Sequence, residues 1–203
     1  MIAAFDLGIK NFAFAIKNKG QFILLKHLNL NENMTKTDLN KYKKKDLVDL
    51  MSNLNISSEK KIKKNDMIDL ILKREKNKVK MKQKDICLSL IELMDSFNHI
   101  WQQCETFLIE RQMTTNLQAL KLSHYLEAYL KIHFSSKKIL NYNATTKTKK
   151  LGATDLKTKK DRKKWTIQYA SNFLSGDNLR LFENLKKKDD IADAICMIES
   201  YLL

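Results

Sequence analysis

Short apolar runs separated by glycine occupy the first part of the chain. The first run begins at Ile2 and stops at Gly8, the second covers Phe12–Ile16, and the third, Gln21–Leu25, follows Gly20. Runs of this length that are bounded by turn residues are typical of β-strands. Three in succession predict an antiparallel meander, which would form the first half of a mixed sheet.

Residues 30–82 follow a different pattern, rich in Asn and then in Lys, with apolar residues near helical spacing. This pattern predicts two amphipathic helices. Because the order of helices and strands resumes afterwards, we interpret the segment as an insertion within a single domain that covers residues 1–203. We expect an apolar stripe of the insertion to pack on the body of the protein or on a partner subunit, and this stripe consists of Leu47, Leu50, Met51 and Leu54.

Helices and strands alternate after the insertion. Apolar positions at helical spacing predict helices over Asp85–Ile100 and Asn116–His133, and the apolar segments Thr106–Ile109 and Lys138–Tyr142 fit strands. The order of elements predicts an α/β protein with a central mixed five-stranded sheet that is flanked by helices on both faces.

The end of the chain contains one segment without any apolar period. Residues 143–160 are rich in Lys and Thr, and we expect a loop there. Two closing helices are expected over Lys163–Leu174 and Asp189–Leu202. The chain contains no proline, so these helices can run without interruption.

The net charge of +15 on 203 residues favours an anionic partner, and nucleic acid is the leading candidate. The charge lies in two windows: residues 36–84 hold 16 Lys/Arg against 7 Asp/Glu, and residues 143–164 hold 9 against 2. A solvated surface is the alternative explanation for such lysine runs. Only four of the 38 basic residues are Arg, which favours contact with the phosphate backbone over recognition of base edges.

Cysteine usage and hydropathy exclude several classes of protein. Cys87, Cys104 and Cys196 form no CxxC pair, which argues against a zinc site and against a disulfide framework. No apolar run reaches the roughly 18 residues that a membrane-spanning helix needs. We therefore expect a soluble protein with reduced thiols in an intracellular, reducing compartment, with no membrane partner.

Acidic residues occur at three places where an apolar element should carry no charge. Asp6 follows four apolar residues inside the first strand, Glu110 follows Phe-Leu-Ile at the end of the fourth strand, and Asp190 and Asp193 lie near the start of the last helix. Asp190 and Asp193 are three residues apart and would project from the same helical face. A buried carboxylate is costly unless a cation compensates it, and oxygen ligands suit Mg²⁺ or Mn²⁺.

Each of these residues also has a purely structural explanation. Asp6 would bond the turn at Gly8, Glu110 would pair with Arg111 or a lysine, and an acidic residue would stabilise the start of the last helix. Their shared placement at two strands and one helix favours metal ligation. The histidines and tryptophans show no comparable spacing, and we interpret them as structural or surface residues.

Three motifs carry a resemblance to a known family. The run AAFDLGIKNFAFAI resembles the Asp-x-Gly-x-x-Asn motif of RuvC-like Holliday junction resolvases, FLIERQM resembles their Ile-Glu-x-Gln motif, and DDIADA resembles their terminal Asp-x-x-Asp-Ala motif. Transposon-encoded nucleases share DLGIKN but generally carry a Cys-rich zinc insertion that this chain lacks. The chain therefore resembles the poxvirus type of resolvase, within the RNase H-like superfamily.

The resemblance implies a set of site residues. Asp6, Glu110, Asp190 and Asp193 would be catalytic and would bind two Mg²⁺ ions per active site, with Mn²⁺ able to substitute. Asp189 is the alternative to Asp190. The family also places a basic residue near the scissile phosphate, and it matches Lys163, with Lys164 or Lys160 as the alternatives.

The resemblance also implies an activity. It predicts a homodimeric, Mg²⁺-dependent endonuclease that makes paired symmetric nicks in four-way DNA junctions, and whose insertion could hold the junction arms. A viral protein of this kind would act in the host cytoplasm or at a viral replication site. The alternatives are another RNase H-like nuclease that cuts flaps, hybrids or transposon ends, and a non-catalytic basic DNA-binding protein. The lysines expected to contact DNA are Lys147, Lys149, Lys150, Lys157, Lys159, Lys160, Lys163 and Lys164.

Overall fold

The computed structural model describes most of the chain. The described residues are 1–30, 39–40, 43–53, 56, 62–79, 86–153, 156 and 158–203. They form two compact units. The first comprises Met1–Leu30 together with Ile86–Leu203, and the second is Asn31–Asp85.

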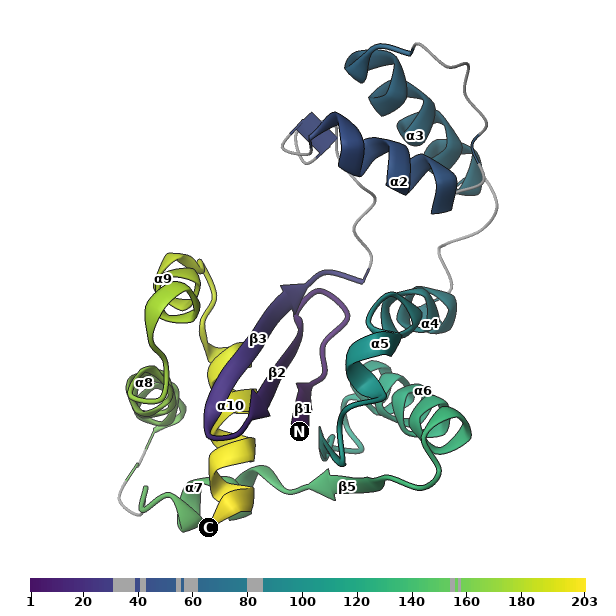
Figure 1. Cartoon of the computed structure of the whole chain (residues 1–203). Coiled ribbons are helices and arrows are strands. Elements are labelled where there is room, and N and C mark those ends of the chain that lie inside the picture. The colour runs from purple at the N-terminus through teal and green to yellow at the C-terminus, as the bar shows by residue number, and fades with distance from the viewer. Residues whose placement is uncertain are drawn as a thin grey trace. The chain divides into compact units, whose positions relative to one another are not determined.

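A five-stranded mixed sheet forms the centre of the first unit, as the sequence predicts. Its strands lie in the order β3-β2-β1-β4-β5 (Figure 1). The β1–β2 and β2–β3 pairs are antiparallel, and the β1–β4 and β4–β5 pairs are parallel. The strands are β1 (Ile2–Asp6), β2 (Phe12–Asn18), β3 (Gln21–Leu28), β4 (Thr106–Glu110) and β5 (Lys138–Tyr142).

Helices cover both faces of this sheet, which confirms the α/β class (Figure 1). One face packs on α4 (Ile86–Ser96), α5 (Asn98–Trp101) and α6 (Leu117–His133) around an aromatic core that includes Trp101 and Phe107. The other face packs on the C-terminal helices, which are α8 (Lys159–Ser171), α9 (Gly176–Asn184) and α10 (Asp189–Leu202).

The alternation of side chains along β1 and β4 decides which face receives the acidic residues. Ala4 and Leu108 pair in register and belong to the core beneath α10. Because side chains two positions apart on a strand share a face, Asp6 and Glu110 point toward the same side as Ala4 and Leu108. Both carboxylates therefore lie at the carboxyl ends of adjacent parallel strands, on the α10 face.

The expected loop at residues 143–160 is partly helical, which corrects the prediction. Helix α7 covers Ala144–Lys150. Asn143 caps it, because its side chain accepts a hydrogen bond from the Thr145 backbone amide. The helix buries Lys147, and Leu151 is buried directly after it. Apolar periodicity missed α7 because it is stabilised by a cap and by one buried lysine.

The closing helices also differ from the expected boundaries. Helix α8 begins four residues before Lys163, because Thr158 and Asp161 form a reciprocal capping box at its start. It ends at Ser171 instead of Leu174. Helix α9 was not predicted. It places Phe182 in the core, and the Asn178 side chain donates a 2.6 Å hydrogen bond to the carbonyl of Phe22.

The second unit corresponds to the insertion and has a core of its own. Helices α2 (Lys44–Asn53) and α3 (Lys64–Val79) are the two helices that the sequence predicts there. Leu47 and Met51 pack with apolar residues of α3, which corrects the expectation that this stripe packs on the body or on a partner. The Leu50 side chain and Leu54 lie outside the described residues.

The cysteines and the hydropathy of the helices bear on disulfides and membrane spans. Cys87, Cys104 and Cys196 all lie in the described part of the chain and form no disulfide, and the last two are buried. Among the helices that the structure describes, each is too short or too polar to cross a bilayer.

Candidate active site

Four acidic residues gather where β1 and β4 end and α10 begins. Phe5 pairs with Ile109 in the parallel register, so Asp6 and Glu110 end neighbouring strands. Helix α10 packs against β1 and supplies Asp190 and Asp193 from its first two turns. The fold thus brings residues from three distant segments of the sequence to one end of the sheet.

Lys147 lies among three of these carboxylates. Its Nζ atom is 2.5 Å from Oδ1 of Asp193 and 3.4 Å from Oε1 of Glu110, and its side chain is 5% exposed. Burial lowers the pKa of Lys147, but the charges of Asp193, Glu110 and Asp6 outweigh burial and raise the pKa above its ordinary value. Lys147 is therefore an ammonium ion whose charge is neutralised by the acidic cluster.

Asp6 is the most strongly perturbed member of the cluster. Burial raises the pKa of Asp6 well above the ordinary value of an aspartate, and the negative charges of Glu110, Asp193 and Asp190 raise it further. Burial also raises the pKa of Asp193, although Lys147 opposes that shift. Carboxylates that repel each other in a buried position require additional positive charge to be ionised together.

Asp190 is held by two basic groups of its own. Nε2 of His27 lies 3.0 Å from Oδ2 of Asp190, and Nζ of Lys187 lies 2.8 Å from the same carboxylate. His27 is placed by β3, where it pairs with Ala13, which in turn pairs with Asp6. The sequence alone predicts a structural or surface role for His27. The only sequence signal for its position was its place near the end of the third strand.

Asp189 and Lys163 form an ion pair between α10 and α8. Burial would raise the pKa of Asp189, but the hydrogen bond from Lys163 and the nearby charge of Lys187 bring it below the ordinary value. Asp189 and Asp190 therefore have different partners. Lys163 lies next to the cluster, and its side chain is 49% exposed, so it is accessible to a bound phosphate.

The lysines expected to contact DNA fall into two groups. Lys147 is buried in the acidic cluster, whereas Lys149, Lys150, Lys159, Lys160, Lys163 and Lys164 are exposed. Lys150 also donates a 3.1 Å hydrogen bond to the carbonyl of Ser200. Lys157 lies outside the described residues.

The donor set at this site fits a hard divalent cation. Asp6, Glu110 and Asp193 offer only oxygen ligands, and their mutual repulsion would be relieved by a cation. Within the described ranges, no three His, Cys, Asp or Glu side chains are spaced so that they hold a metal ion directly. In this arrangement the positive charge comes from Lys147, whose ammonium contacts two of the three carboxylates.

The chain is similar to two proteins of invertebrate iridescent viruses. The chain is 51% identical over 202 residues to the uncharacterized protein 97L of invertebrate iridescent virus 3, and the alignment covers 99% of this chain and 98% of the relative. The chain belongs to the 97L family. Protein 170L of invertebrate iridescent virus 6 is 29% identical over 226 residues, which covers 98% of this chain and 87% of that protein. No family model matches.

The fold of this 97L-family chain is also that of a solved resolvase. The fowlpox virus resolvase, whose crystal structure contains its Holliday junction DNA substrate, matches with a TM-score of 0.50 at 15% identity. The match covers 99% of this chain and 95% of the fowlpox protein. The chain thus shares the α/β fold of the fowlpox virus protein, with the central mixed five-stranded sheet that the sequence predicts.

Proposed function

We propose that this protein is a structure-selective endodeoxyribonuclease that resolves four-way DNA junctions by paired symmetric nicks. The observation that carries the proposal is the convergence of Asp6, Glu110 and Asp193 at the end of a RuvC-like sheet. The fowlpox virus protein of the same fold was crystallised with a Holliday junction, which supports branched DNA as the substrate.

The proposed cofactor is Mg²⁺, with Mn²⁺ as a substitute. Asp6, Glu110, Asp190 and Asp193 would hold two ions. When bound, such ions supply the positive charge that stabilises the attacking and leaving oxygens of a phosphodiester. His27 holds the Asp190 carboxylate in a fixed orientation, as partners of metal-binding side chains commonly do.

We also propose that two lysines act on the phosphate. Lys147 lies inside the acidic cluster, and Lys163 lies at its edge on Asp189. An ammonium in either position would stabilise negative charge that develops on the phosphate oxygens. We propose both as catalytic residues, whereas the sequence alone favoured Lys163 and treated Lys147 as a DNA contact.

The exposed lysines of α7 and α8 would hold the DNA backbone near this site. A four-way junction has approximate two-fold symmetry and requires two cuts, so we also propose that the protein acts as a homodimer. Cysteines without disulfides suit the reducing compartment proposed for it, the host cytoplasm or a viral replication site.

The experiment that tests this proposal is a substrate panel with the full-length protein in Mg²⁺. The panel contains a synthetic four-way junction, a flap, linear duplex DNA and an RNA–DNA hybrid. Symmetric nicks that DNA ligase can reseal, made preferentially on the four-way junction, are the expected result. Preferential cutting of the flap or the hybrid would establish a different RNase H-like nuclease, and binding without cutting would establish a DNA-binding protein.

A further inference from the structure

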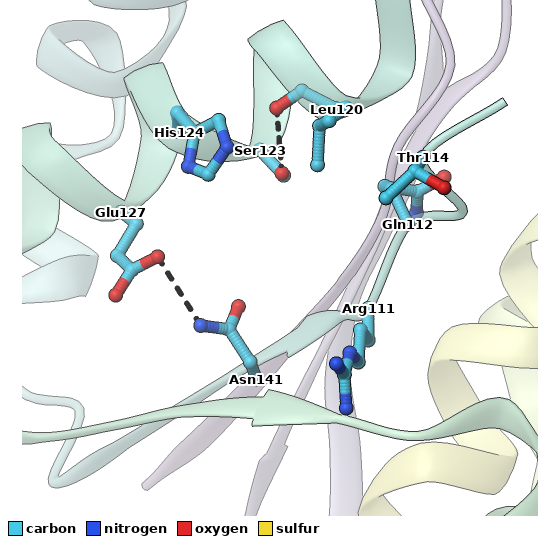
Figure 2. A pocket seen from close by; sticks show the side chains of 8 residues that line it. All are labelled: Arg111, Gln112, Thr114, Leu120, Ser123, His124, Glu127 and Asn141. Atoms are coloured by element: carbon cyan, nitrogen blue, oxygen red, sulfur yellow. Dashed lines mark hydrogen bonds between the residues drawn. The ribbon is translucent and has the colours of Figure 1, made fainter. Parts of the chain in front are cut away.

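A cavity of about 370 Å³ opens between the ends of β4 and β5 and helix α6, on the α6 face of the sheet (Figure 2). Arg111 and Gln112 line it from the strand side, and Leu120, His124 and Glu127 line it from α6. Figure 2 shows these side chains arranged around an open centre. A second cavity of about 310 Å³ continues from Arg111 and Gln112 along the following residues.

The cavity adjoins the candidate active site through the backbone of β4. The amide of Arg111 donates a 2.8 Å hydrogen bond to the carbonyl of Tyr142, so the β4–β5 pairing extends one residue past Glu110. The Gln112 side chain donates a 3.1 Å hydrogen bond to the carbonyl of Glu110. Because successive side chains alternate, Glu110 faces α10 whereas Arg111 faces α6. The cavity and the acidic cluster therefore lie on opposite faces of the sheet and share its carboxyl end, so a base would reach the cavity from the cluster around the end of β4.

The polar groups of the cavity indicate which hydrogen-bonding groups a ligand should carry. Nζ of Lys131 lies 2.7 Å from the Glu127 carboxylate, and the Asn141 side chain donates a 3.1 Å hydrogen bond to it. Both hydrogen bonds lower the pKa of Glu127, and the one from Lys131 has the larger effect. The Glu127 side chain is therefore an ionised acceptor at neutral pH. A carboxylate in this position disfavours a phosphate. Arg111 offers several donors in a planar arrangement on the opposite side of the cavity.

We propose that this cavity binds an unpaired guanine base from the branch point of the junction. Guanine presents two neighbouring donors, N1–H and the 2-amino group, which a carboxylate such as Glu127 accepts together. Its O6 and N7 atoms are acceptors that an arginine such as Arg111 can bind in a bidentate manner. Adenine, cytosine and thymine do not combine two adjacent donor groups with this acceptor edge.

Leu120 and His124 supply the less polar wall against which the base would lie. Taking a base out of the stack costs least where pairing is already disturbed, as it is at a branch point. The inference rests on the proposed function, since it assigns a nucleotide subsite to the same junction substrate. It adds one base-specific contact to a DNA-binding surface whose lysines otherwise contact phosphates.

The test compares two four-way junctions that differ only in the 2-amino groups of the guanines near the branch point. In one, every guanine within two base pairs of the branch point is replaced by hypoxanthine, which lacks only the 2-amino group. Dissociation constants are measured in EDTA and cleavage rates in Mg²⁺ for the wild type, Glu127→Gln and Glu105→Gln. Glu105 is a matched control, because it immediately precedes β4, at the end of that strand opposite Glu110.

Wild type and Glu105→Gln are expected to bind the hypoxanthine junction about tenfold more weakly than the guanine junction. Glu127→Gln is expected to bind both junctions equally, because its amide no longer accepts from both donors. Equal wild-type binding of the two junctions, or an undiminished difference in Glu127→Gln, would overturn the proposal. Discrimination in binding without any cleavage would instead reject the nuclease function and retain the guanine site.

Discussion

The ammonium of Lys147 lies 2.5 Å from the carboxylate of Asp193, although the two residues are 46 positions apart. The contact joins α7 to α10 at the point where β1 and β4 present Asp6 and Glu110. A buried lysine in this position neutralises part of the negative charge of carboxylates that would otherwise repel one another. It makes α7, which resembles a loop in sequence, a structural part of the site.

Replacing Lys147 with Met should destabilise the metal-free protein by about 3 kcal/mol, because the substitution leaves buried carboxylates unpaired. Urea unfolding in EDTA, followed by tryptophan fluorescence, measures this, since Trp101 and Trp165 both belong to the first unit. Lys149→Met on the exposed side of α7 is the control and should change stability little. Added Mg²⁺ should stabilise Lys147→Met more than the wild type. Equal stability of the two variants would show that the buried ion pair contributes nothing.

The stability of the metal-free protein should decrease as the pH rises through the raised pKa of Asp6. The folded state binds this proton more tightly than the unfolded state, so the stabilising contribution is present at low pH and is lost on deprotonation. Asp6→Asn should flatten this dependence and should be the more stable protein at neutral pH. Urea titrations in EDTA at several pH values between about 5 and 8 test this. Parallel curves for the two proteins would contradict the buried position of Asp6.

Asp190→Asn should reduce junction cleavage by more than roughly a hundredfold, and Asp189→Asn by about tenfold. The reason is that Asp190 belongs to the proposed metal-binding set, whereas Asp189 acts through its ion pair with Lys163. Titration with Mn²⁺, followed by electron paramagnetic resonance, gives a second readout. Weaker binding is expected in Asp190→Asn alone. The reverse order of effects would make Asp189 the ligand.

Lys160→Met combined with Lys164→Met should weaken DNA binding similarly for all sequences. Both residues lie on the exposed part of α8, and each phosphate that is no longer neutralised should reduce the slope of log K against log salt by about 1. Binding assays at several NaCl concentrations measure the slope. Lys19→Asn is the matched control, since it removes a charge at the β2–β3 turn, where its φ of 45° suits Asn. An unchanged slope in the double variant would remove α8 from the DNA surface.

The sheet and the position of its acidic residues could be predicted from the sequence because the relevant signals are local. Apolar runs bounded by glycine define β1 and β2. Asp6 and Glu110 are the last residues of their strands, and each lies two positions after a residue of the same in-register pair, Ala4 and Leu108. The parallel pairing of β1 with β4 then brings them together without any further information.

Other parts of the site depend on contacts that leave little trace in the local pattern. Helix α7 has no apolar period, so the location of Lys147 follows from its partners Glu110 and Asp193. His27 contacts Asp190 although the two residues are 163 positions apart, and the residues next to each of them carry no pattern that predicts this contact. The same holds for α9, which contributes a single fully buried side chain, Phe182, to the core.

Cleavage of a synthetic four-way junction by the wild type and by Asp6→Asn, each with and without Mg²⁺, tests the central claim most directly. Asp177→Asn is the control, because this aspartate lies fully exposed on α9. Wild type and Asp177→Asn should make symmetric nicks only with Mg²⁺, and Asp6→Asn should bind the junction but leave it intact. Cutting by Asp6→Asn at the wild-type rate would contradict the assignment of the acidic cluster as the active site.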